Sequence, residues 1–165
     1  MTFKDWLVSK KLDEQPTSSN EIIDLLKLAD QKIDDCEKMS ACGVSAQTYH
    51  ENVYMAAIPS AKAILRVSGY RTSEETKGGQ DILFQCLTFT VYPNPKDIIV
   101  FGVARKLRKQ SAYDSVAEVE PDATDLFNKV KQLRVDVESW IRKNHPHLLK
   151  SQTTEAAAAK ESSSS

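Results

Sequence analysis

Apolar residues recur every three or four positions over most of the chain, which is the spacing of helices that bury one face. The pattern is clearest in three long segments, residues 20–38, 45–68 and 121–143. Ser18 and Glu21 fit the start of the first segment as a capping pair. Gly69 follows the second segment, where a left-handed residue commonly ends a helix, and Pro121 suits the first turn of the third. We expect each segment to form a long amphipathic helix.

Two shorter segments complete the predicted fold. Residues 81–91 are rich in apolar side chains and are assigned to a helix, although residues 87–92 taken alone alternate like a strand. A further helix is expected over about 96–110. Pro59 lies inside the second long segment, where we expect a kink and not an end. The pattern therefore predicts an all-α fold, an antiparallel four- to five-helix up-and-down bundle.

The chain divides into three parts by composition. Residues 1–16 are predicted to be an N-terminal amphipathic arm that docks on the bundle through Phe3, Trp6, Leu7 and Leu12. Residues 17–147 form the predicted bundle. Residues 148–165, which end in a run of four serines, are expected to be a disordered tail.

Composition and charge restrict the classes of function. The 165 residues are 41% hydrophobic and 27% charged, as in one soluble globular domain, and the net charge is −1. The whole molecule therefore has no general attraction for nucleic acid, so binding of RNA would need a local cluster of cations. With no secretory signal and no membrane-spanning stretch, we expect a cytoplasmic protein without a membrane partner. Cys36, Cys42 and Cys86 lack the spacing of a zinc site, and we expect no metal and no cofactor.

One basic segment is the main candidate for chemistry. Arg105, Lys106, Arg108 and Lys109 lie at the end of the 96–110 helix, and Tyr113 follows Arg108 by five positions. Three interpretations of the cations remain open: they complement the helix dipole, they bind phosphates of RNA, or they bind an acidic face of a partner protein. Tyr113 is either a packing residue whose hydroxyl caps the backbone, or a catalytic or modified phenol.

Three groups of segments resemble the small bacterial HEPN-type helical proteins, a superfamily associated with toxin–antitoxin and phage-defence systems. The first group runs from Trp6-Leu7 to Ala29-Asp30, and the second from Tyr54-Met55-Ala56-Ala57 to Gly69-Tyr70-Arg71. The third runs from Arg105-Lys106-Leu107-Arg108 through Tyr113-Asp114 to Trp140-Ile141. The resemblance covers about residues 3–143 and implies a HEPN-like bundle that forms a homodimer.

In active members of that superfamily, an Arg followed by a small polar residue precedes a His by five positions, and this pair cleaves RNA between two subunits. Here Arg108 matches the Arg, Lys109 occupies the small polar position and Tyr113 occupies the His position. Family members also tend to have Asn where this chain has Met55, and Gly-His-His where it reads Gly79-Gln80-Asp81. A phenol with a pKa of about 10 is a poor proton acceptor near neutrality. The resemblance therefore implies a degenerate ribonuclease site at Arg108 and Tyr113.

We expect a HEPN-like protein that acts by binding in a toxin–antitoxin or phage-defence module. Its expected partners are a second copy of itself, a cognate antitoxin or nucleotidyltransferase, and RNA at the basic segment. One alternative is a metal-independent endoribonuclease toxin that uses Arg108 and Tyr113. A second alternative is a structural subunit of a larger assembly.

Overall fold

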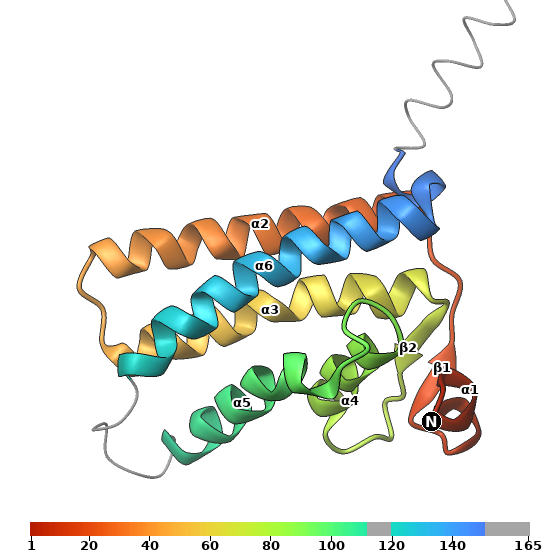
Figure 1. Ribbon diagram of the computed structural model, residues 1–165, viewed down its shortest axis with the longest axis horizontal. Coiled ribbons are helices and arrows are strands. Elements are labelled where there is room, and N and C mark those ends of the chain that lie inside the picture. The colour runs from red at the N-terminus through yellow and green to blue at the C-terminus, as the bar shows by residue number, and fades with distance from the viewer. Residues whose placement is uncertain (112–119, 151–165) are drawn as a thin grey trace, which may run out of the picture.

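The computed structural model describes residues 1–111 and 120–150, and helices dominate this part of the chain. The longest are α2 (Ser19–Ala41), α3 (Ala46–Val67), α5 (Ile99–Ser111) and α6 (Glu120–Asn144). Along the chain these four alternate in direction, so that α3 and α6 run the same way (Figure 1). The predicted helical fold is confirmed.

Helix α3 is the centre of the molecule. It packs along both α2 and α6, and it also contacts α5 and α4 (Gly79–Gln85). Ala56, Ala57, Ala61 and Ala63 are all fully buried in it, and such small side chains allow neighbouring helices to approach closely. Helix α5 packs mainly on α3, with little contact to α6, so the arrangement departs from a regular four-helix bundle. Helix α3 does not end at Pro59, which confirms that part of the prediction.

Local capping explains where the long helices begin. The Ser18 hydroxyl accepts a hydrogen bond from the Glu21 backbone N–H at 3.2 Å, and Ser45 accepts one from Thr48 at 3.2 Å. The Ser18 half of the predicted capping pair is therefore confirmed. The Glu21 carboxylate instead accepts a hydrogen bond from the Thr17 hydroxyl at 2.7 Å and others from Arg66. Gly69 has a φ of +90°, as its place after α3 predicted.

Two glycines give a matched test of backbone conformation. A Cβ on Gly69 or on Gly102 would meet no atom within 4 Å, so neither substitution by alanine creates a clash. Gly69→Ala is expected to lower the free energy of unfolding by about 1 kcal/mol, because alanine is disfavoured at positive φ. Gly102→Ala is expected to raise it by about 0.5–1 kcal/mol, since Gly102 lies inside α5. Urea unfolding followed by circular dichroism measures both, and equal effects of the two changes would contradict this account.

A small sheet joins the N-terminal arm to the end of α3. Strand β1 (Leu12–Glu14) pairs antiparallel with β2 (Tyr70–Thr72), with Leu12 opposite Thr72. The sheet was not predicted. Ahead of it, α1 (Phe3–Val8) buries Trp6, and Phe3 stacks on Tyr70 with ring centroids 5.1 Å apart. Trp6 and Leu12 are both buried, as the amphipathic pattern of the arm predicted.

Arg66 near the end of α3 connects the arm to the bundle. Its side chain is only 5% exposed and donates five hydrogen bonds of 2.7–3.2 Å. Two go to the Glu21 carboxylate, and the others go to the backbone carbonyls of Gln15, Pro16 and Tyr70. The bonds from Arg66 hold the pKa of Glu21 below its ordinary value, because they favour the charged carboxylate.

The segment assigned to residues 81–91 is helical and not a strand. Helix α4 is followed by the 3-10 helix η1 (Cys86–Phe89), and η2 (Pro95–Ile98) leads into α5. The Tyr92 hydroxyl donates a 2.6 Å hydrogen bond to Asp136, which attaches this region to α6. No helix within the described residues is long and apolar enough to cross a membrane.

Helical structure extends slightly beyond the predicted bundle boundary at residue 147. Residues Pro146–Leu149 form the 3-10 helix η3, which contacts α2 and α6. Leu148 and Leu149, which the sequence assigned to the tail, pack against the core. Residues 151–165 of the predicted tail lie outside the described residues.

Candidate functional site

The basic segment lies on the C-terminal half of α5, and the helix turns its four cations to two different sides. Phe101 and Ala104 are buried against the body of the protein, and Arg105 and Arg108 follow on nearly the same face. Lys106 and Lys109 are exposed, and neither pairs with a carboxylate of the described residues. Arg105 and Arg108 are therefore partly buried against the protein, whereas Lys106 and Lys109 are exposed.

Arg105 is bound to the start of α4. Its guanidinium forms an ion pair with Asp81, and its side chain is only 14% exposed. The contact joins the basic segment of α5 to Gly79-Gln80-Asp81, the first three residues of α4. A cation that is largely buried and paired in this way primarily positions α5 on α4.

Arg108 is bound to α3. Its Nε donates a hydrogen bond of 3.0 Å to Oε1 of Glu51, and its guanidinium carbon lies 5.9 Å from the centre of the Tyr54 ring. Glu51 and Tyr54 are three positions apart on α3 and therefore share one side of that helix. The guanidinium thus combines an ion pair with a cation–π contact.

Tyr54 is the buried centre of this arrangement. Its side chain is fully buried, and its hydroxyl donates a 3.2 Å hydrogen bond to Oε1 of Gln80. Burial raises the pKa of Tyr54 above that of an ordinary phenol, and the charges of Arg105 and Arg108 only partly oppose this shift. The phenol therefore stays protonated near neutrality and serves as a hydrogen-bond donor.

The three helices bring together side chains from separate parts of the sequence. We call this group the arginine cluster; it comprises Glu51, Tyr54, Gln80, Asp81, Arg105 and Arg108. The sequence alone indicated the two arginines as candidates but not Glu51, the partner of Arg108. Glu51 lies one helical turn before Tyr54, but only the packing of α5 on α3 determines that this side faces Arg108.

Of the predicted catalytic pair, only Arg108 lies among the described residues. Arg108 lies in the arginine cluster, whereas Tyr113 lies outside the described residues. Each arginine has a carboxylate partner, Asp81 or Glu51, so the positive charge that a phosphate would meet is largely compensated.

No metal centre accompanies the cluster in the described part of the chain, where no three His, Cys, Asp or Glu side chains come together as ligands. Comparison with protein-family models, with curated proteins and with solved structures gives no match.

Proposed function

We propose that this is a cytoplasmic, HEPN-like helical protein that acts by binding a macromolecular partner in a toxin–antitoxin or phage-defence module, and that it does not cleave RNA. One observation carries the proposal. Arg108 is held by Glu51 on one side and by the Tyr54 ring on another. A scissile phosphate would have to displace Glu51 before it reached this guanidinium.

The outer side of α5 supports a binding role. Ile99 and Val103 are 58% and 45% exposed, and they fall on the same side of the helix as Lys106. Lys109 extends this side toward the end of the helix. We call these four residues the outer edge of α5. Exposed apolar side chains grouped on one side of a helix suit a protein interface, with the two lysines at its solvent-accessible rim. We propose that the first partner of this edge is a second copy of the chain.

Cleavage of RNA by the purified protein tests the central claim. We expect wild type and Arg108→Ala to leave a mixed RNA substrate equally intact over hours at neutral pH. Lys27→Ala, which changes an exposed lysine on α2, is the matched control for loss of a positive charge. Robust cleavage by wild type that Arg108→Ala abolishes and Lys27→Ala preserves would contradict the proposal.

Light scattering coupled to size-exclusion chromatography tests the dimer. Wild type is expected to elute with twice the mass of the chain, and Val103→Asp with the mass of one chain, because a carboxylate would be buried in the interface. Val135→Asp is the control, since Val135 is 58% exposed on α6 and should leave the dimer intact. A monomeric wild type, or dissociation by both changes, argues against an interface at the outer edge of α5.

A metal-independent endoribonuclease is the second candidate, and one observation favours it. The Arg108–Glu51 pair is partly open, with side chains 33% and 48% exposed, and exposed ion pairs are weak. A competing phosphate has a route to Arg108 if Glu51 swings away. In that case Arg108→Ala and Tyr113→Phe would each relieve growth toxicity when the protein is expressed.

A further inference from the structure

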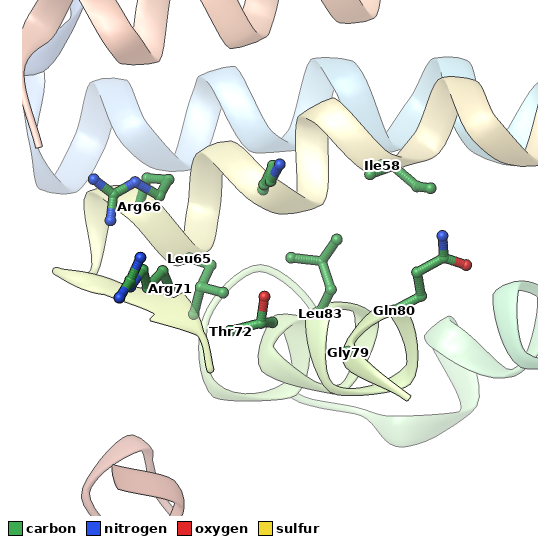
Figure 2. Close-up of a pocket in the computed structure, with 9 residues that line it drawn as sticks. Ile58, Leu65, Arg66, Arg71, Thr72, Gly79, Gln80 and Leu83 are labelled. Carbon is green, nitrogen blue, oxygen red and sulfur yellow. The ribbon is translucent and has the colours of Figure 1, made fainter. Parts of the chain in front are cut away.

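A cavity of about 340 Å³ opens between α3, β2 and α4 (Figure 2). This volume is within the range of small-molecule sites. Ile58 and Leu65 from α3 and Leu83 from α4 give it an apolar wall. In Figure 2, Leu83 points from α4 toward α3, and Leu65 points from α3 toward β2 and α4. An apolar group placed here would be enclosed from two sides.

The polar part of the cavity is cationic. Lys62, Arg66 and Arg71 line it, and no carboxylate is among the described residues that do so. Arg66 already donates five hydrogen bonds within the protein, as described above. Arg71 is different. Its ion pairs with Asp13 and Glu74 are 3.4 and 3.9 Å long, beyond the usual length of a charge-assisted hydrogen bond, and its side chain is 44% exposed.

Lys62 is the second available cation. It is exposed on α3 and pairs with no carboxylate of the described residues, although its charge helps to lower the pKa of Glu21. Thr72 and Gln80 add neutral polar groups to the lining. The cavity therefore joins an apolar wall to two cations: Lys62 has no carboxylate partner among the described residues, and Arg71 is only loosely paired.

The neighbouring acids limit the charge of a suitable ligand. Glu21 pairs with Arg66, and Asp13 and Glu74 lie near Arg71, so the three cations stand beside three carboxylates and carry no surplus positive charge. A monoanion matches this balance better than a dianion such as a phosphate monoester. A carboxylate also fits the planar fork of a guanidinium.

We propose that this cavity binds a small monocarboxylate with an apolar body, such as a medium-chain fatty acid or an arylalkanoic acid. Its carboxylate accepts hydrogen bonds from Arg71 and Lys62, and its apolar body packs against Ile58, Leu65 and Leu83. This site is separate from the arginine cluster, which it adjoins at Gln80, and the proposal does not depend on the proposed function.

Isothermal titration calorimetry of the full chain with octanoate and 3-phenylpropanoate tests the proposal. Octanol carries the apolar body without charge, and acetate carries the charge without the body. We expect saturable one-site binding of at least one of the two acids with a Kd of about 1 mM or tighter. Octanol and acetate are expected to bind at least about tenfold more weakly, because octanol lacks the carboxylate and acetate lacks the apolar body.

Variants locate the binding. Arg71→Gln and Lys62→Gln are each expected to weaken binding of the acid by about tenfold, whereas Lys27→Gln on α2 should bind as wild type does. Gly79→Ala changes the size of the cavity without changing its charge. Its Cβ would lie 3.8 Å from the Thr72 side chain, an ordinary contact, so the fold is retained while the cavity narrows. The proposal is overturned if neither acid saturates wild type, if octanol binds as tightly as octanoate, or if Arg71→Gln and Lys62→Gln both bind normally.

Discussion

Replacing Arg66 with methionine is expected to lower the free energy of unfolding by about 3–5 kcal/mol, the largest loss for any single charged residue described here. The change removes five hydrogen bonds at once. It leaves the carbonyls of Gln15, Pro16 and Tyr70 without this donor, and the Glu21 carboxylate keeps only its hydrogen bond from Thr17. Unfulfilled acceptors in a site that is largely closed to water are costly.

The matched control is Arg142→Met, the same chemical change on a side chain that is 68% exposed and paired with Glu138 at 2.7 Å. Its effect is expected to stay within about 0.5 kcal/mol, since exposed ion pairs contribute little. Arg66→Lys should fall between the two variants, because an ammonium retains the charge but cannot reach all these acceptors. Urea unfolding measures the three, and similar losses for Arg66→Met and Arg142→Met would contradict the role of Arg66.

Phe101→Ala is expected to destabilise the protein by about 3–5 kcal/mol. Phe101 is fully buried and is the large side chain by which α5 is anchored to the body. Its ring stacks on that of Phe84 in α4, with centroids 4.7 Å apart and planes inclined by 8°. Removing the Phe101 ring leaves a cavity between α5 and α4.

Val135→Ala on α6 is the control, since Val135 is 58% exposed and its truncation should cost less than about 0.5 kcal/mol. Hydrogen exchange adds a local measurement. In Phe101→Ala the amides of α5 should lose protection before those of α2 and α3, because α5 has fewer neighbours. Uniform loss of protection through all helices would mean that Phe101 supports the whole core and not α5 in particular.

Sequence reasoning located the long helices well because their signals are local. The apolar spacing and the serine caps place the start of α2 and α3 within a residue or two of their observed positions. Gly69 ends α3 because a left-handed backbone is needed there, which is a property of a single residue. The segment at 81–91 was less certain, since tertiary packing of α4 and η1 outweighs its strand-like alternation.

The small sheet, in contrast, has no local sequence signal that predicts it. Each strand has three residues, too few to display a period of two. The pairing of Leu12 with Thr72 depends on the end of α3 arriving beside the arm. That approach is set by the packing of α3 against its neighbours, and nothing in either strand indicates its partner.

In the candidate site, too, the sequence indicates the helix positions, whereas tertiary packing determines the partners. The positions of Arg105, Lys106, Arg108 and Lys109 on one helix followed from the sequence. Which of them faces the protein depends on how Phe101 and Ala104 are buried, and the identity of the partners depends on α3 and α4. Glu51 has no local feature that marks it as the partner of Arg108.

Arg66 and Arg71 illustrate what the sequence determines and what the tertiary structure determines. The sequence by itself determined that α3 ends near them and that both carry a positive charge at neutral pH. Only the tertiary structure decided that Arg66 is buried with five acceptors while Arg71 borders an open cavity. The physical reason is that helix formation depends on neighbours within four residues, whereas burial and hydrogen bonding of a side chain depend on segments that folding brings together.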